Sequence, residues 1–167
     1  MKPTDLVVTP MGLRFLGRLF PCTVGRGGIV PPGRKREGDG ATPAGVHRLG
    51  GMLYRPDRLT RPADWALPIG PFDLWSDDPT DPDYNLMVRA PHGFGHERLR
   101  RPDPMYDLVV ITDWNWPQAE PGRGSAIFLH QWRRPGAPTA GCVALARRGL
   151  HWIAPRITHP TRLVVPG

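Results

Sequence analysis

Short apolar runs, separated by turn-forming residues, recur along the whole chain. The run at Leu108–Thr112 is almost continuously apolar, which is typical of a strand buried on both faces in the middle of a sheet. Two stretches without clean periodicity, residues 31–45 and 54–83, predict loops, the second one long and ordered with short strand pieces. Further strands are expected at residues 6–8, 13–20, 22–24, 46–53, 84–89, 125–130 and 161–165. The pattern therefore predicts a mainly β fold.

The periodicity changes after Cys142. Apolar residues between 143 and 153 lie opposite Arg147 and Arg148, a pattern that predicts one amphipathic helix ending before Pro155. Cys142 would then lie at the N-terminus of this helix, where the helix dipole and unpaired N–H groups stabilise an anion. Such a position is expected to lower the pKa of its thiol.

The composition is that of an ordinary globular protein, with 40% hydrophobic and 22% charged residues. The 167 residues suffice for one domain with its own core, so we expect a single domain over residues 1–167. The net charge of +7 comes almost entirely from arginine, because Lys2 and Lys35 are the only lysines. No basic stripe interleaved with aromatic residues is visible, so nucleic acid is not an expected partner.

No stretch approaches the roughly eighteen apolar residues of a membrane span, so no membrane association is expected. The first residues also lack the apolar run of a signal peptide, which predicts a cytoplasmic protein, or a periplasmic one if a leader has been removed. Two cysteines fit a reducing compartment, although a disulfide between Cys22 and Cys142 stays open. The sequence leaves the oligomeric state open.

Cys142 is the candidate nucleophile, because it follows a Thr-Ala-Gly segment and comes twelve positions after His130, which ends a predicted strand. A free thiol has a pKa of about 8.5, so it needs a base such as an imidazole to become a good nucleophile near neutral pH. Glycine lets successive N–H groups converge on one point, so Gly141 and Cys142 are the expected backbone donors to an oxyanion. These residue types point to acyl transfer through a thioester.

Two blocks of the chain resemble the L,D-transpeptidase (YkuD-type) catalytic domain. The segment that runs from His130 to Thr139-Ala140-Gly141-Cys142 is similar to the family's His…[Ser/Thr]-His-Gly-Cys signature. Residues 35–45, Lys-Arg-Glu-Gly-Asp-Gly-Ala-Thr-Pro-Ala-Gly, are similar to its Lys-x-Gly-Asp-Gly-x-Thr-Pro-x-Gly segment. The blocks occur in the family's order, and with the strands between them the resemblance covers nearly the whole chain. It implies a β-sandwich-type catalytic fold with a helix that follows the cysteine.

The resemblance also implies roles for individual residues. Cys142 would attack the substrate, His130 would move the proton, and the backbone carbonyl of Gln131 would orient the imidazole ring. Thr139 occupies the family's Ser/Thr position and is expected to contact substrate near the nucleophile. Ala140 is expected to line the substrate site as well, but it replaces the family's usual histidine, a departure that bears on substrate orientation rather than on the chemistry.

Further side chains are candidates for substrate contact. Arg133 and Arg134 carry guanidinium groups that pair with peptide carboxylates through forked hydrogen bonds, although a solvated rim is the alternative interpretation. Thr42 lies in the first of the two family blocks. His92 and His96 have the spacing of a helical metal pair, but the glycines between them disfavour a helix, so we expect groove lining or an exposed loop and no metal. A metallohydrolase stays an alternative.

The resemblance implies attack on the bond between the diamino acid and the terminal D-Ala of a peptidoglycan stem tetrapeptide, through a thioester and without a cofactor. Water as acceptor gives an L,D-carboxypeptidase that trims muropeptides in cell-wall recycling, whereas an amine gives a transpeptidase that forms 3–3 cross-links. The lack of an export signal favours hydrolysis. A non-catalytic peptidoglycan-binding module is a further alternative.

Overall fold

One large sheet dominates the computed structural model, which describes residues 2–167. Its strands, in spatial order, are β3 (Arg18–Phe20), β2 (Gly12–Phe15), β1 (Leu6–Thr9), β15 (Arg162–Val165), β7 (Gly45–Tyr54), β12 (Leu108–Thr112), β13 (Phe128–Gln131), β14 (Val143–Leu145) and β4 (Cys22–Thr23), with β8 (Leu67–Pro68) beside β7. The two edge strands, β3 and β4, are joined by Pro21 alone. Because one residue spans only about 3.8 Å, the sheet has to curl round on itself like a barrel.

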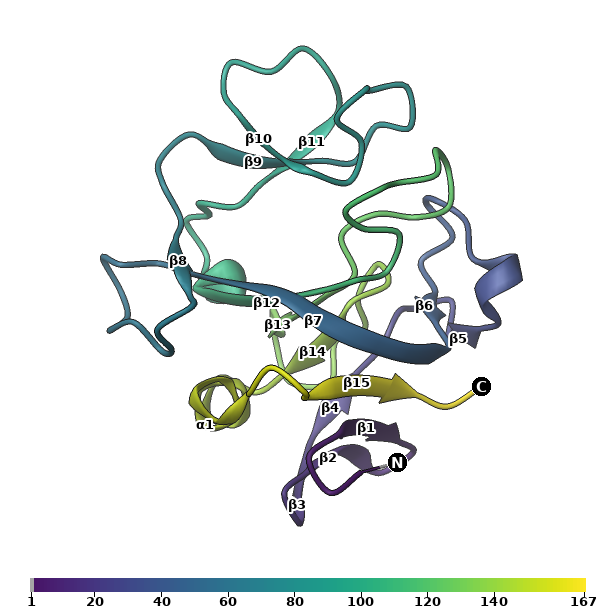
Figure 1. The fold of residues 1–167 in the computed structure, drawn as a ribbon, viewed down its shortest axis with the longest axis vertical. Helices are drawn as coiled ribbons and strands as arrows, with labels where there is room; N and C mark the ends of the chain where they lie inside the picture. The colour runs from purple at the N-terminus through teal and green to yellow at the C-terminus, as the bar shows by residue number, and fades with distance from the viewer. Residues whose placement is uncertain (1) are drawn as a thin grey trace.

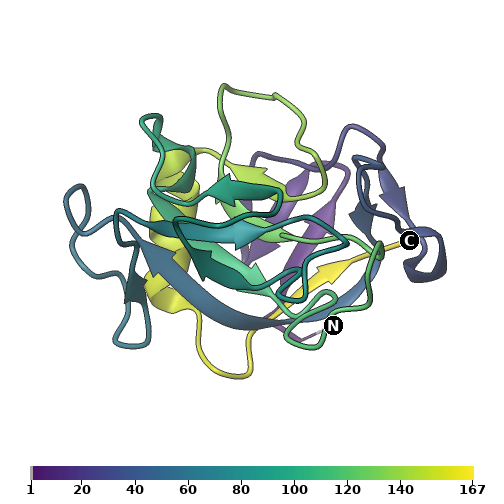
Figure 2. The same ribbon diagram turned by 90° about the horizontal axis from the view of Figure 1, so that it is seen from above.

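Smaller elements lie around this curled sheet. The strands β9 (Asp73–Ser76), β10 (Met87–Arg89) and β11 (His96–Arg98) form a three-stranded sheet at one end of the molecule, opposite the end that carries β1, β2 and β3 (Figures 1 and 2). A two-stranded sheet joins β5 (Ile29–Val30) to β6 (Thr42–Pro43). The helical elements are the 3₁₀ turns η1 (Pro32–Arg34), η2 (Pro104–Tyr106) and η3 (Ala154–Arg156) and the helix α1 (Arg147–Ile153).

The core has two parts, one on each face of the central strands. On one face Leu108, Val110 and Leu129 pack with residues of α1. On the other face Val109 and Phe128 pack beneath the small sheet formed by β9, β10 and β11. Since successive residues of a strand face opposite sides, this arrangement buries all five residues of β12. The predictions of a mainly β fold and of a central strand at 108–112 are confirmed.

The helix expected directly after Cys142 is wrong in its first turn. Val143–Leu145 forms β14, which pairs in parallel with β13 and antiparallel with β4, and α1 begins at Arg147. Three successive buried residues are compatible with a strand as well as with a helix. The segment forms a strand because β13 and β4 lie on either side of it and pair with it. Cys142 therefore precedes a strand, and no helix dipole stabilises its thiolate.

Other strand boundaries differ from the prediction where the backbone turns. The segment 13–20 is a hairpin rather than one strand, because Leu16 and Gly17 have φ values of 47° and 74°, typical of a type I′ turn. The strand expected at 84–89 begins only at Met87, since Asn85 also has a positive φ of 61°. Among the described residues, no helix is long and apolar enough to cross a membrane.

Candidate active site

Two neighbouring parallel strands bring His130 and Cys142 together. In the pairing of β13 with β14, His130 lies opposite Ala144, two residues beyond Cys142. Residues that lie opposite each other in neighbouring strands face the same side, so His130 and Ala144 project from one face of the sheet. Cys142 and His130 both line a cavity of about 850 Å³, called the Cys142 cavity below.

The sulfur of Cys142 is held as a buried thiol. Its Sγ donates a hydrogen bond to the carbonyl oxygen of Ala126 at 2.9 Å and accepts one from the N–H of Phe128 at 3.4 Å. Burial raises the pKa of the Cys142 thiol to about 12. Within residues 2–167 no hydrogen bond joins this sulfur to His130. The thiolate expected from the sequence is therefore not the resting form, because a buried charge without a pairing cation is costly.

The other cysteine lies on the opposite side of the sheet. Cys22 packs against the part of the core that contains α1, whereas Cys142 belongs to the part beneath the small sheet. Both cysteines are free in the structure, so the disulfide left open by the sequence is not formed.

His130 is buried and neutral. Its Nδ1 lies 2.8 Å from the carbonyl oxygen of Gln131, the contact that the family resemblance implies. Burial lowers the pKa of His130 to about 4, and the positive charge of Arg101 lowers it further, against the Gln131 carbonyl, which raises it. With the Nδ1 proton donated to that carbonyl, Nε2 carries the lone pair that a general base needs. The Tyr106 ring and the imidazole pack in a T-shaped arrangement, with ring centroids 5.2 Å apart.

The backbone around Gly141 forms a tight turn with one free donor. The Gly141 N–H donates to Thr139 Oγ1 at 3.0 Å, and this hydroxyl donates to the Cys142 carbonyl oxygen at 2.6 Å. The Gly141 N–H therefore already donates a hydrogen bond within the protein, whereas the sequence predicted that it would be free to bind an oxyanion. The Cys142 N–H has no hydrogen-bond partner in the described part of the chain. Thr139 lines the Cys142 cavity, but its hydroxyl builds the turn.

Thr42 lies beneath the Cys142 cavity instead of lining it. Its side chain is completely buried, and its hydroxyl bonds the Gly25 N–H and the carbonyl oxygen of Gly141. A Cβ on Gly141 would come within 3.0 Å of the Ala41 carbonyl oxygen. The first sequence block therefore packs directly under the second, and the expected substrate contact by Thr42 is corrected to a structural contact.

Charged side chains of both signs line the Cys142 cavity. The basic ones are Arg26, Arg98, Arg101, Arg133 and Arg134, and the acidic ones are Glu37, Asp77 and Glu97. Burial raises the pKa values of Asp77 and Glu97, and the negative charge of Glu37 raises that of Asp77 further. Ala140 lies exposed on the cavity wall, as expected from the sequence. The three acids were missed, since they come from separate segments and share no motif.

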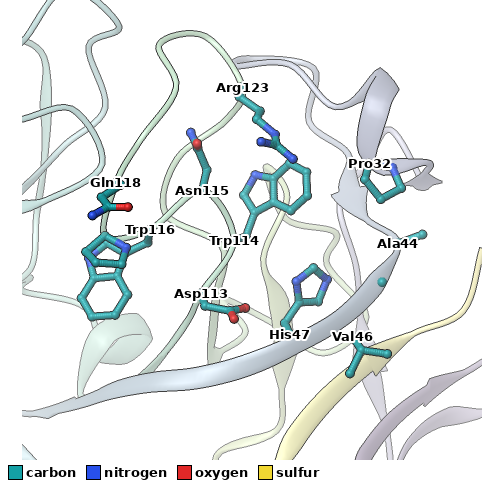
Figure 3. Close-up of a pocket in the computed structure, with 12 residues that line it drawn as sticks. Pro32, Ala44, Val46, His47, Asp113, Trp114, Asn115, Trp116, Gln118 and Arg123 are labelled. Atoms are coloured by element: carbon teal, nitrogen blue, oxygen red, sulfur yellow. The ribbon is translucent and has the colours of Figure 1, made fainter.

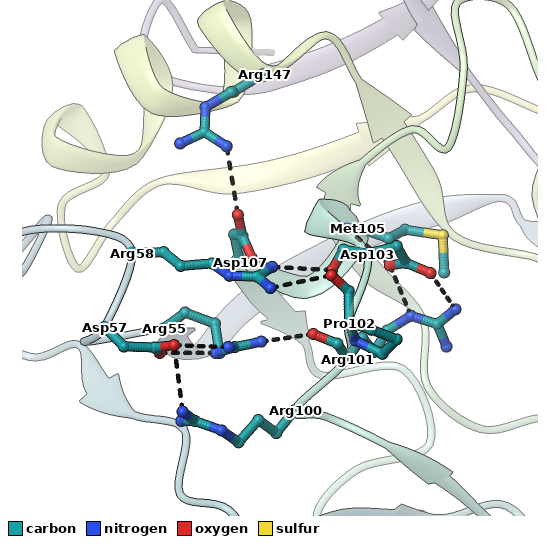
Figure 4. Close-up of polar contacts among 10 residues, drawn as sticks. All are labelled: Arg55, Asp57, Arg58, Arg100, Arg101, Pro102, Asp103, Met105, Asp107 and Arg147. Atoms are coloured by element: carbon teal, nitrogen blue, oxygen red, sulfur yellow. Dashed lines mark hydrogen bonds and ion pairs between the residues drawn. The ribbon is translucent and has the colours of Figure 1, made fainter.

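An ion-pair network fixes the loop that carries Tyr106. Asp107 pairs with Arg58 at 2.8 Å and with Arg147 of α1 at 3.3 Å. Figure 4 shows that this carboxylate lies between the two guanidinium groups, which come from segments far apart in sequence. The network holds Tyr106 where its ring meets His130.

His92 and His96 lie away from the sulfur. His92 Nε2 is 2.6 Å from Oδ2 of the buried Asp81, and the ring lines a second cavity of about 460 Å³. His96 borders both this cavity and the Cys142 cavity, so only His96 is placed for the groove contact expected of the pair. Among residues 2–167, no three His, Cys, Asp or Glu side chains gather in a way that would hold a metal ion.

A third pocket, of about 460 Å³, lies around His47, Trp114 and Trp116 (Figure 3). It shares no lining residue with the Cys142 cavity. The guanidinium of Arg123 lies over the Trp114 ring, 5.0 Å from its centroid. No cysteine, serine or threonine lines the pocket, so the candidate active site is the Cys142 cavity.

Residues 14–165, nearly the whole chain, match the family profile of the L,D-transpeptidase catalytic domain (YkuD). The chain belongs to this L,D-transpeptidase family. No curated protein and no solved structure matches the chain. The matched range includes both sequence blocks, the cysteine and the histidine. The resemblance seen in the sequence is therefore confirmed.

Family membership establishes the general activity of this L,D-transpeptidase domain. It is an enzyme of the cysteine-dependent, L,D-transpeptidase type that acts on peptidoglycan. The family also accounts for the mainly β fold with a helix after the cysteine.

Proposed function

We propose that this L,D-transpeptidase domain acts as an L,D-carboxypeptidase, which removes the terminal D-Ala from a peptidoglycan stem tetrapeptide. Cys142 is the nucleophile and His130 the general base. One observation carries the proposal: the Cys142 thiol and the neutral His130 ring line one cavity, and the Cys142 N–H has no hydrogen-bond partner among residues 2–167. Together these groups form the set that acyl transfer needs.

The first half of the reaction makes a thioester. The thiol turns from the Ala126 carbonyl toward His130 Nε2, which takes its proton as Sγ bonds to the scissile carbonyl carbon. The Cys142 N–H then stabilises the negative oxygen of the tetrahedral intermediate. The bond to D-Ala breaks, its nitrogen takes the proton from His130, and free D-Ala leaves.

The second half regenerates the thiol. His130 removes a proton from water, the hydroxide attacks the thioester carbonyl, and the sulfur leaves as the thiol with the returned proton. One water is consumed, and a tripeptide is released. The thioester would face a cavity lined by charged side chains, which supports water as the acceptor because such walls attract water. An amine acceptor would give a 3–3 cross-link by the same chemistry.

The charges of the cavity suit such a peptide. The stem peptide carries carboxylates, which Arg101, Arg133 and Arg134 can pair, and its diamino acid carries an ammonium group. Asp77 and Glu97 offer carboxylates to that ammonium group. A ligand with both charges therefore matches walls of both signs.

The test is incubation of the enzyme with purified tetrapeptide, with and without an amine acceptor, followed by mass spectrometry. Loss of one alanine from the tetrapeptide without an acceptor supports carboxypeptidase action. A cross-linked dimer as the main product would show that the enzyme is a transpeptidase instead. Cys142→Ala should abolish either product. Cys22→Ala is the matched control and should retain full turnover, because Cys22 lies on the other side of the sheet.

The non-catalytic peptidoglycan-binding module left open by the sequence is disfavoured, because the chain belongs to the L,D-transpeptidase family. This candidate predicts that the tetrapeptide binds but stays intact. Binding measured by calorimetry without any release of D-Ala would contradict the proposed hydrolysis.

A further inference from the structure

Thr42 holds one specific peptide unit of the candidate active site. The Gly25 N–H donates to Thr42 Oγ1 at 2.8 Å, and Oγ1 lies 2.7 Å from the carbonyl oxygen of Gly141. An N–H can only donate, so the Thr42 hydroxyl uses its own proton for the Gly141 carbonyl. The direction of both hydrogen bonds is therefore fixed, in a place from which water is excluded.

The Gly141 carbonyl and the Cys142 N–H belong to the same peptide unit. A trans peptide is planar, with its C=O and N–H pointing in opposite directions. When Thr42 fixes the carbonyl on the buried side, the Cys142 N–H must point the other way. Gly141 adopts a φ of +148°, which favours glycine, so the sequence favours the turn that orients this N–H.

The other polar groups of the turn are all paired. The Gly141 N–H and the Cys142 carbonyl both bond the hydroxyl of Thr139, and the Gly141 carbonyl bonds that of Thr42. Of the four backbone groups of Gly141 and Cys142, the Cys142 N–H alone has no partner within residues 2–167. Two threonine hydroxyls thus leave one donor free beside the sulfur.

We propose that Thr42 is a positioning residue that aims the Cys142 N–H at the oxyanion of the acyl-transfer intermediate. The inference rests on the proposed function in that Cys142 forms a thioester. Thr42 touches no substrate and acts through the Gly141–Cys142 peptide. Its hydroxyl is needed when negative charge develops on the carbonyl oxygen, and it leaves the nucleophilicity of the sulfur unchanged.

The test separates reactions with and without an oxyanion, in a Cys22→Ala background that leaves one thiol. Alkylation of Cys142 by iodoacetamide displaces iodide at a saturated carbon and forms no oxyanion. Acylation by p-nitrophenyl acetate forms one: the Sγ–acetyl bond is made, p-nitrophenolate leaves, and His130 takes the thiol proton. Thr42→Val should acylate about 10- to 100-fold more slowly, below the roughly 10²–10³-fold loss from deleting a whole oxyanion donor. Its alkylation rate should not change.

Two variants complete the comparison. Thr42→Ser keeps the hydroxyl and should restore acylation to within about threefold of the parent. Thr23→Val is the matched control, because Thr23 bonds the Ala137 carbonyl at 2.8 Å but not the Gly141–Cys142 peptide, and it should behave like the parent. If Thr42→Val does not fold, the smaller Thr42→Ala is measured in the same way.

Normal acylation by the folded Thr42→Val or Thr42→Ala variant would overturn the proposal, and so would an equal loss of alkylation and acylation. Neither reagent is a peptide, so the result does not depend on the substrate. If the parent acylates but releases no D-Ala from tetrapeptide, the proposed function fails while the role of Thr42 stands. With tetrapeptide as substrate, Thr42→Val should lower kcat and leave KM within about twofold.

Discussion

At the scale of single residues, the candidate active site is a neutral pair rather than an ion pair. Burial raises the pKa of Cys142 to about 12 and lowers that of His130 to about 4. At neutral pH the thiol keeps its proton and the imidazole has none. The proton can therefore move between them during the attack, without a charged resting state that burial would destabilise. The sequence suggested both residues as candidates but predicted a thiolate, because the pattern placed Cys142 at the start of a helix.

The pH dependence of turnover follows from His130. The ring must be neutral to accept a proton, so the base is present above its pKa and is lost as the pH falls through about 4. The acid limb of kcat/KM should lie near pH 4 and not near 6.5. Its position is measured with tetrapeptide in buffers of constant ionic strength. An acid limb at 6.5 would show that the ring is hydrated in solution.

The reactivity of the free enzyme follows from Cys142. Its thiol is protonated up to about pH 12, so alkylation by iodoacetamide should be slow at pH 7 and still rising at pH 10. The rate is read by intact mass in a Cys22→Ala background. A plateau reached below pH 8 would mean that the thiolate is the resting form after all.

Gly141→Ala tests the turn beside the sulfur. At a φ of +148° an added Cβ is strained, and it would also meet the Ala41 carbonyl oxygen and an Ile127 methyl within about 3 Å. We expect a loss of about 1–3 kcal/mol in the free energy of unfolding, with a larger proportional loss of activity. Gly136→Ala is the comparison, because Gly136 also has a positive φ but has open space around it. If both variants lose activity equally, the close packing of Gly141 is irrelevant.

At the scale of elements, the pairing of strands explains which strands could be predicted from the sequence and which could not. The continuous apolar run of β12 predicted a central strand, because both of its faces are buried. The apolar residues of β14 gave no such signal, since three of them fit a helix equally well. Its partners β13 and β4 come from residues far away in the chain, and no local pattern contains them.

The Asp107→Asn variant tests whether the ion pairs of Asp107 stabilise the contact between α1 and the loop that carries Tyr106. The Asp107 carboxylate is almost fully buried between Arg58 and Arg147, so Asp107→Asn should lower the free energy of unfolding by about 1–3 kcal/mol. Asp64→Asn is the matched control, because Asp64 is exposed and forms no ion pair among residues 2–167. Urea unfolding measures both. Equal stability of the two variants would contradict a structural role for the network.

At the scale of the whole molecule, the Cys142 cavity is assembled from several distant segments. The two family blocks predicted the nucleophile, the base and the turn, because these residues lie in contiguous motifs. Asp77 and Glu97 lie outside both blocks, and Glu37 lies in the first block at a position that the family pattern leaves variable, so only the fold shows that the three acids share one cavity. Thr42 was found but misassigned, because its motif does not reveal that the hydroxyl points into the core.

The acidic part of the cavity should recognise an amino group. Asp77→Asn should raise KM about tenfold for a tetrapeptide with a free side-chain amine, because one charge-assisted contact is worth about 1.5–3 kcal/mol. The same variant should leave KM unchanged for the acetylated peptide. Asp64→Asn, away from the cavity, changes the net charge by the same amount and is the control. An equal effect on both peptides would remove Asp77 from amine recognition.

A covalent bond between Cys142 and the substrate is the central feature of the proposed reaction. Rapid acid quenching of the enzyme with tetrapeptide, followed by intact mass spectrometry and digestion, measures this bond. We predict that the protein gains the mass of the tripeptide minus water, that the adduct maps to Cys142, and that Cys142→Ala gains nothing. Release of D-Ala by Cys142→Ala, or an adduct on another residue, would contradict the account.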